Sequence, residues 1–514
     1  MNGAESLVET LLNNGVDICF ANPGTSEMHF VAALDKYPDM RCILCLFEGG
    51  VTGAADGYYR MKEDVAATLL HLGPGLANGV ANLHNARKSK SGIVNIVGDH
   101  ADYHLRYDSP LKSDLKGISN AISHWSHATN DALSVAHDGA AAVRAARSKG
   151  GQISTLILPA NTAWGMAEGP AEFSAPPALQ RPSNDEIVYA AKSLGKPGAC
   201  LFVGHKALYG KLAQLAGKIA AKSGCEIVAD FLVPRIERGE GSIKLTRMNY
   251  PIVENLEILK HIKHMVLCGS NRPVAFFAYP GLPSTPEPLG CNITELCLPD
   301  MDYAWTLQAL ADELGVGSET RPATVNLDLP AIPTGGMSVA KVGEALGALL
   351  PGNAIVVDES ITNGGPLVEA TKTGRNQDWM HVVGGAIGQG LPVAVGAAIA
   401  CPDRKVVSLM GDGSAMYTLQ SLWTMARESL DVVNIIFANR GYQILHLELA
   451  NVGVEEVGRN AARMFDVENP TLDWVALAKG HGVSGERVTS ADEFVSALRK
   501  GLATTEPYLI EVVC

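Results

Sequence analysis

Two polar residues in the last third of the sequence each come at the end of an apolar run. Asp412 follows the run 405–410 after a single glycine, and Asn439 directly follows the run 432–438. A carboxylate and an amide oxygen are hard ligands of the kind that Mg²⁺ accepts, usually with phosphate oxygens and water in its remaining positions. These residue types therefore indicate a divalent-metal site that also binds a diphosphate.

The residues beside Asp412 suit an anion as well. Gly411 and Gly413 allow backbone N–H groups to approach an anion closely, because glycine has no Cβ. Ser414 stands where a helix is predicted to start, and helix N-termini attract phosphate. An alternative without any ligand stays open: Asp412 as a helix N-cap and Asn439 in an unrelated turn.

The elements that would position these residues form a predicted βαβ unit. The runs 405–410 and 432–438 read as strands, and the segment 416–428 between them reads as a helix. In a parallel sheet, ligands bind beyond the carboxyl ends of the strands. We therefore expect Asp412 and Asn439 to lie close together at that edge.

The same alternation of apolar runs and helical patterns extends over the whole chain. Continuous apolar runs separated by helices are typical of parallel strands that are covered on both faces. The sequence therefore predicts an α/β fold of three doubly wound parallel-sheet domains. The runs are 18–20, 42–47, 66–71, 93–97, 154–158, 199–203, 226–229, 264–268, 354–357, 405–410, 432–438 and 508–513.

Two segments read as linkers between these domains. Residues 163–185 and 321–337 contain several prolines and few bulky apolar side chains, which is typical of boundaries between compact units. They divide the 514 residues into the ranges 1–165, 185–320 and 337–514.

Composition excludes several classes of protein. The net charge is −13, with 54 acidic and 41 basic residues, so the chain is a poor candidate for nucleic-acid binding, which needs clustered Lys and Arg. No apolar run reaches about 18 residues, the length that a membrane helix needs. The N-terminal segment 1–12 carries two glutamates and reads as a helix and not as a signal peptide. We therefore expect a cytoplasmic protein that binds no membrane.

The segments around Asp412 and Asn439, placed within a βαβ unit, resemble the cofactor motif of thiamine-diphosphate enzymes. The resemblance implies that Asp412, Asn439 and the main-chain carbonyl of Gly441 hold Mg²⁺, which in turn holds the diphosphate. It also implies that the three domains are, in order, pyrimidine-binding, central, and diphosphate- and Mg-binding.

Other segments resemble the same family. Glu48, with Ala54 and the pair 57–58, is similar to the segment with the family's glutamate. The resemblance implies that Glu48 hydrogen-bonds the cofactor's pyrimidine and so drives formation of the nucleophilic ylid, which attacks a 2-oxo acid. The glycine-rich stretch 384–392 is similar too, and implies that the Gly385 carbonyl meets the 4′-amino group.

Three further residues are assigned by the same resemblance. Ile387 would support the bent shape of the cofactor from below. Thr362 and Asn363, in a segment that follows another apolar run, would contact the diphosphate.

Within this family, the chain is most similar to benzoylformate decarboxylases. Asn22-Pro23-Gly24-Thr25 resembles their Asn-Pro-Gly-Ser segment, which implies that Thr25 faces the substrate carboxylate. His71 ends an apolar run and resembles one of their active-site histidines, where an imidazole can transfer protons near neutral pH. A structural, hydrogen-bonded role for His71 stays open.

The sequence departs from this pattern at Phe276, which stands where those enzymes carry a second catalytic histidine. A phenyl ring transfers no proton, so another residue does that work or the reaction differs. His100, His104 and His381 are the spare candidates. The departure favours a second hypothesis, acetolactate synthase, which adds the intermediate to another 2-oxo acid.

Further expectations concern ligands and partners. FAD is not expected, because Gly204 is a lone glycine and no persuasive flavin loop is present. The substrate is expected to be a small 2-oxo acid. By resemblance, Ile444 and Leu445 would lie near it. By resemblance, the active site lies between the first domain of one subunit and the third of another, in a homodimer or homotetramer.

Two hypotheses of other classes stay open. The chain could be a catalytically silent subunit that binds thiamine diphosphate or regulates a partner. The weaker of the two is an ordinary NAD-dependent enzyme.

Overall fold

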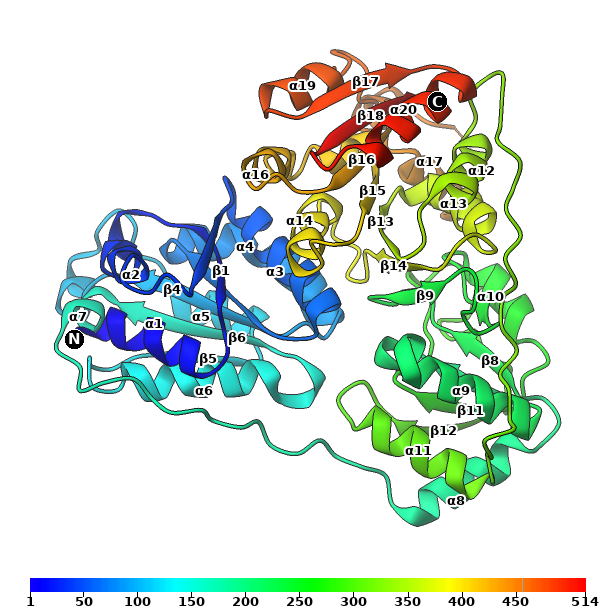
Figure 1. Cartoon of the computed structure of the whole chain (residues 1–514), viewed down its shortest axis with the longest axis horizontal. Helices are drawn as coiled ribbons and strands as arrows, with labels where there is room; N and C mark the ends of the chain where they lie inside the picture. The colour runs from blue at the N-terminus through cyan, green and yellow to red at the C-terminus, as the bar shows by residue number, and fades with distance from the viewer. Residues whose placement is uncertain (455) are drawn as a thin grey trace.

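The computed structural model describes residues 1–454 and 456–514, which form three sheets flanked by helices (Figure 1). The first sheet has six parallel strands in the order β2-β1-β3-β4-β6-β5. Its strands are β1 (Ile18–Asn22), β2 (Arg41–Leu44), β3 (Ala66–Leu70), β4 (Ile93–Asp99), β5 (Trp125–Ala128) and β6 (Ile153–Pro159). The accompanying helices are α1 (Gly3–Asn13), α2 (Met28–Leu34), α3 (Glu48–Lys62), α4 (Leu72–Lys88), α5 (Leu115–Ile122), α6 (Val135–Arg147) and α7 (Ala160–Trp164), with the 3-10 turn η1 (Thr25–Glu27).

The second sheet has five parallel strands in the order β10-β8-β7-β11-β12. The strands are β7 (Ala199–Val203), β8 (Glu226–Ala229), β10 (Thr246–Arg247), β11 (His264–Cys268) and β12 (Asn292–Cys297). The helices are α8 (Asn184–Leu194), α9 (Gly210–Ser223), α10 (Ile252–Leu259) and α11 (Tyr303–Glu313).

The third sheet has seven strands in the order β17-β18-β16-β15-β13-β14-β9. Six are parallel to one another: β13 (Ala354–Glu359), β14 (Gln377–His381), β15 (Val406–Gly411), β16 (Val432–Ala438), β17 (Ser484–Val488) and β18 (Tyr508–Val513). The helices are α12 (Val339–Leu349), α13 (Gly364–Thr371), α14 (Gly390–Ala400), α15 (Asp412–Ala415), α16 (Ser421–Arg427), α17 (Gln443–Asn451), α18 (Arg459–Phe465), α19 (Trp474–Gly480) and α20 (Ala491–Ala503). The prediction of three parallel-sheet α/β domains is thus confirmed.

One strand of the third sheet comes from the middle of the chain. Strand β9 (Ile236–Arg238) lies within the range predicted for the central domain, yet it pairs antiparallel with β14. Within the two proline-containing segments, residues 171–179 and 325–334 have neither helix nor strand and run along the outside of the molecule (Figure 1). Their role as domain boundaries stays a prediction.

Of the single helix predicted over 416–428, only the part over α16 forms, and a turn over 416–420 joins it to the short helix α15, which ends at Ala415. The turn follows tertiary contacts, because the Thr418 hydroxyl donates to the carbonyl of Gly388 at 2.8 Å. A contact between residues this far apart in the sequence cannot be seen in a local helical pattern. The turn thus ties the Asp412 region to the glycine-rich segment before α14.

Helix α3 packs directly on α14, so the first and third sheets share one hydrophobic core. The two backbones meet at glycines: a Cβ at Gly396 would lie 1.9 Å from the carbonyl oxygen of Ala54, and one at Gly57 would lie 2.1 Å from that of Val393. Larger residues would force these helices apart. Among the described residues, no helix is both long and apolar enough to cross a membrane.

Candidate active site

Glu48 is the first residue of α3 and is almost fully buried, at 7% exposure. Its Oε2 accepts a hydrogen bond from Nδ2 of Asn78 on α4, at 2.9 Å. Gly75 leaves space for the other oxygen, since a Cβ there would lie 3.1 Å from Oε1. The carboxylate is therefore fixed between the starts of two helices, where helix dipoles favour a negative charge.

His71 forms a hydrogen-bonded dyad with the carboxylate of Glu27, a residue that was not predicted to be functional from the sequence. The imidazole Nδ1 lies 2.8 Å from Oε2 of Glu27, a residue with 4% exposure. The same carboxylate accepts from the backbone N–H of Gly24 at 2.8 Å and from the hydroxyl of Ser26. This contact orients the imidazole through Nδ1 and leaves Nε2 outside the dyad.

The segment predicted to meet the substrate carboxylate lies against this dyad. A Cβ at Gly24 would lie 2.1 Å from Nδ1 of His71, so only glycine fits there. Thr25 itself is exposed, and the neighbouring Ser26 hydroxyl lies 3.3 Å from Nδ1 of His71. In the sequence, the glutamate two residues beyond Thr25 is the signal that could have pointed to the dyad. Its partner His71, which is distant in sequence, became apparent only in the fold.

Asp412 and Asn439 lie together at the carboxyl edge of the third sheet, as the βαβ unit predicts. Strands β15 and β16 pair in a register that sets Gly411 beside Phe437. Asp412 is 3% exposed, and its two oxygens accept from the backbone N–H groups of Gly413 at 2.8 Å and Arg440 at 2.7 Å. Burial raises the pKa of Asp412, an effect that these hydrogen bonds oppose.

The donors at this edge fit a Mg²⁺ ion that a diphosphate helps to hold. Asn439 offers an amide oxygen, Oδ1, which accepts a hydrogen bond from the backbone nitrogen of Gly441 at 3.3 Å. Among the described residues, no group of three or more His, Cys, Asp or Glu side chains could hold a metal ion. A cation held by one buried carboxylate, an amide oxygen and a backbone carbonyl needs further oxygen ligands, which phosphates supply.

Ser414 and the segment 361–363 flank the same edge. The Ser414 hydroxyl donates to the carbonyl of Gly411 at 3.0 Å, so it stabilises the turn into α15. Thr362 and Asn363 are half-buried in a 3-10 turn that follows β13. Both therefore follow the carboxyl end of β13, and their contact with a diphosphate stays a prediction.

A second buried carboxylate, Glu359, fixes the glycine-rich segment. It accepts hydrogen bonds from the backbone N–H groups of Gly388 and Gly390. Burial raises the pKa of Glu359 to about 7. We name residues 384–389 the glycine loop. It begins with Gly384, includes Ile387, which is half-buried, and has Gly385 in the left-handed region at φ +75°.

Phe276 of the central region lies against the glycine loop. A Cβ at Gly385 would be 2.8 Å from Cζ of Phe276. The Phe276 ring is 5.2 Å from that of Tyr250, whose hydroxyl donates to Glu448 at 2.7 Å. Glu448 belongs to α17, the helix that also carries Ile444 and Leu445.

The spare histidines differ in their surroundings. His100 and His104 are neighbours, with ring centroids 5.7 Å apart, and Nε2 of His100 lies 3.0 Å from the hydroxyl of Ser109. His381 is 8% exposed at the end of β14, and burial lowers its pKa well below the usual value. Burial thus disfavours a charged imidazole at this position.

Within one chain, the polar side chains Glu48, Glu27 and His71 make no hydrogen bond to Asp412 or Asn439, among the described residues. In the part of the chain that the structure describes, Glu48, Glu27 and His71 hydrogen-bond only within the first domain. Asp412 and Asn439 hydrogen-bond only within the third.

Comparisons with known proteins agree with this geometry. The model "Thiamine pyrophosphate enzyme, N-terminal TPP binding domain" matches residues 1–127, and the corresponding C-terminal TPP binding domain matches residues 367–512. The Mycobacterium tuberculosis protein named "Putative acetolactate synthase large subunit IlvX" is 46% identical over 514 residues, which cover 100% of this chain and 99% of that protein. The chain therefore belongs to the thiamine pyrophosphate (thiamine diphosphate) enzyme family.

More distant relatives are named as decarboxylases. Benzoylformate decarboxylase of Pseudomonas aeruginosa is 27% identical over 535 residues, covering 98% of this chain and 97% of that protein. The solved structure of a thiamine diphosphate-dependent 4-hydroxybenzoylformate decarboxylase from Rhodococcus jostii superposes with a TM-score of 0.83 at 23% identity, covering 100% and 99% of the two chains. The protein is thus a thiamine-diphosphate-dependent enzyme of the decarboxylase and acetolactate-synthase-like type.

Proposed function

We propose that the protein is a Mg²⁺-dependent enzyme that decarboxylates a small 2-oxo acid. The observation that carries this proposal is the buried Asp412 beside Asn439, at the edge where β15 and β16 end. When bound, thiamine diphosphate supplies the electron sink for the electron pair that loss of CO₂ releases.

Each half of the site has a separate task in this proposal. Glu48 holds the proton at the pyrimidine nitrogen, and its buried position between α3 and α4 excludes water from that contact. The third-domain residues bind the metal and the cofactor. They are Asp412, Asn439 and Gly441 for Mg²⁺, and Gly385, Ile387, Gly411, Gly413, Ser414, Thr362 and Asn363 for the cofactor.

The substrate side is formed by polar residues of the first domain. The Thr25 hydroxyl is exposed and can donate to the carboxylate of a 2-oxo acid. Nε2 of His71 can hold or deliver a proton, because Glu27 engages Nδ1. Ile444 and Leu445 offer apolar surface to the acyl group, which does not separate a methyl from a phenyl substituent.

The second candidate function is acetolactate synthesis, and Phe276 favours it. This phenyl ring lies beside Gly385 and cannot act there as a proton donor. An acyl group that is not protonated there can be transferred to a second 2-oxo acid. The name of the relative that is 46% identical supports the same reaction.

We further propose that two copies of the chain form each complete site, in a homodimer or homotetramer. The absence of a hydrogen bond from Glu48, Glu27 or His71 to Asp412 or Asn439, among the described residues, supports this. So do the large apolar side chains that stay exposed on and after α17, namely Leu445, Leu447, Val452, Val454, Val457 and Met464.

The test is CO₂ release by the purified protein with thiamine diphosphate, run with and without EDTA. Pyruvate and benzoylformate are assayed side by side and the products are identified. An aldehyde product supports the decarboxylase, and acetolactate supports the synthase. Absence of CO₂ from both substrates, with the cofactor bound, would favour the silent subunit. Full activity after removal of Mg²⁺ would contradict the metal role of Asp412.

A further inference from the structure

A buried ion pair on α3 lies two turns beyond Glu48. Asp56 and Arg60 are 0% and 4% exposed, and the guanidinium donates from Nε and Nη2 to the two carboxylate oxygens at 2.9 and 2.6 Å. Charges this deep cost desolvation that largely offsets their attraction, so a buried pair contributes geometry more than stability. The other hydrogen-bond partners of Asp56 and Arg60 show which part of the structure the pair holds in place.

Asp56 accepts two further hydrogen bonds, one from each side. The Ser91 hydroxyl donates to Oδ1 at 2.5 Å, and Nε2 of Gln389 donates to Oδ2 at 2.8 Å. Gln389 is the last residue of the glycine loop. The carboxylate of the first domain therefore fixes one end of a loop that belongs to the third.

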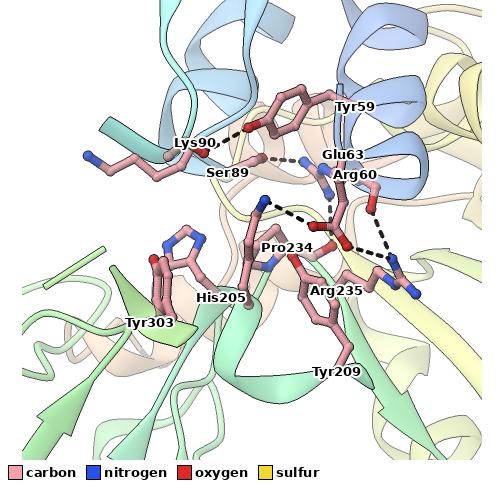
Figure 2. Close-up of a pocket in the computed structure, with 12 residues that line it drawn as sticks. Tyr59, Arg60, Glu63, Ser89, Lys90, His205, Tyr209, Pro234, Arg235 and Tyr303 are labelled. Carbon is pink, nitrogen blue, oxygen red and sulfur yellow. Dashed lines mark hydrogen bonds and ion pairs between the residues drawn. The ribbon is translucent and has the colours of Figure 1, made fainter. Parts of the chain in front are cut away.

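Arg60 fixes the end of the strand that leads into the loop. Its Nη1 donates to the carbonyl of His381 at 2.8 Å, and His381 is the last residue of β14, just before the glycine loop. The same nitrogen reaches the carbonyl of Pro234 in the central region at 3.3 Å, and Nη2 donates to Ser89 (Figure 2). One guanidinium thus contacts all three parts of the chain, at the wall of a small pocket between the first and central domains.

Side chains of α4 hold the middle of the same loop. Asn85 donates to the carbonyl of Ala386 at 2.8 Å and accepts from its N–H at 3.2 Å. The carbonyl of Gly384 lies 2.9 Å from Nε2 of His84. The loop is therefore held along its length by the first domain of its own chain: Asp56 holds its last residue, and Arg60 holds the strand end just before it.

We infer that Asp56 and Arg60 are positioning residues that set the conformation of the glycine loop for the cofactor. The inference rests on the proposed function, because it gives the Gly385 carbonyl and Ile387 their roles. It adds that the first domain of a chain shapes the cofactor loop of that same chain, besides offering Glu48.

The test compares Arg60→Lys, Asp56→Asn and Gln389→Ala with the unmodified protein. Lysine keeps the charge but cannot donate in a fork to Asp56 and also reach His381. Gln389→Ala removes only the contact at the loop's end, and so keeps the test valid if the other variants fail to fold. The matched control is Arg147→Lys, since Arg147 and Asp64 form a similar forked pair, at 2.9 and 3.1 Å, elsewhere in the first domain.

Amide hydrogen exchange of residues 382–389 is measured on the cofactor-free protein, and thiamine diphosphate affinity is measured by spectroscopic titration. We expect exchange to be about tenfold faster and the Kd to be about tenfold higher in the Arg60 and Asp56 variants, with Gln389→Ala between them and the control unchanged.

Folded Arg60→Lys with normal loop exchange and normal affinity would overturn the inference, as would faster exchange spread evenly over all domains. If the unmodified protein bound no thiamine diphosphate, the proposed function would fail, yet the exchange data would still test the loop's anchoring.

Discussion

Two carboxylates of the first domain, Glu48 and Glu27, have separate roles although both are nearly buried. Glu48 has an amide partner, Asn78, and leaves one oxygen facing Gly75. The carboxylate of Glu27 hydrogen-bonds to three groups, namely Gly24, Ser26 and the His71 ring. The first is therefore placed to meet a ligand, and the second to orient an imidazole.

Glu48→Gln should lower kcat at least about 100-fold, because an amide cannot accept the proton that a carboxylate holds at the pyrimidine nitrogen. The fold should persist, since the glutamine carbonyl can still accept from Asn78. Steady-state CO₂ release and the melting temperature measure the two effects. Wild-type turnover in this variant would remove Glu48 from the catalytic set.

Glu27→Gln should slow product formation about tenfold or more while thiamine diphosphate affinity stays unchanged. The amide no longer favours the proton on Nδ1 of His71, so the tautomer with a free Nε2 is less populated. The double variant with His71→Ala should be no slower than His71→Ala alone, because the two residues act as one unit. Fully additive losses would show that Glu27 acts independently of His71.

At the scale of elements, local pattern was sufficient for the βαβ unit of Asp412 and Asn439. Apolar runs locate β15 and β16, and the residues that follow them necessarily share an edge. The pairing of β9 with β14 was not predictable, because a three-residue strand carries little signal. The ion pair of Asp56 with Arg60 was not predictable either, because its role depends on a contact with Gln389, which is far away in the sequence.

Glu359 makes the stability of the third domain depend on pH. Its folded-state pKa is raised from 4.5 to about 7 by burial. Between these values the folded protein keeps a proton that the unfolded chain releases, so the free energy of unfolding should fall as pH rises from 4.5 to 7. The stabilising contribution is complete below pH 4.5 and lost above pH 7.

Glu359→Gln tests this, because glutamine does not titrate. Urea unfolding at pH 5 and pH 7.5 should show the unmodified protein losing about 1 to 3 kcal/mol relative to the variant over that interval. An equal difference between the two proteins at both pH values would contradict the assignment.

At the scale of the whole molecule, the first domain holds its own chain's glycine loop, yet the carboxylate of Glu48 has no hydrogen bond to the edge with Asp412 and Asn439 in the described residues. The proposed pairing of two copies accounts for both features, because a second copy would complete the half-site that the first domain leaves open. Closed symmetric dimers provide such completion twice, since each copy offers both halves.

Mixing two inactive variants tests this arrangement. Glu48→Gln chains keep an intact metal edge, and Asp412→Asn chains keep an intact glutamate. If each site joins the two, a mixed dimer has one complete site and one doubly defective site. Random pairing makes half of the dimers mixed, so about one quarter of wild-type activity should return after co-refolding.

The control mixture replaces the Asp412→Asn chain by the double variant Glu48→Gln/Asp412→Asn. No dimer in that mixture has any Glu48, so no activity should return, although subunit exchange is the same. Activity near zero in both mixtures, with exchange verified by differently tagged chains, would place the whole site within a single chain. Recovery in the first mixture alone requires Glu48 of one copy to act on the cofactor that Asp412 of the other copy holds.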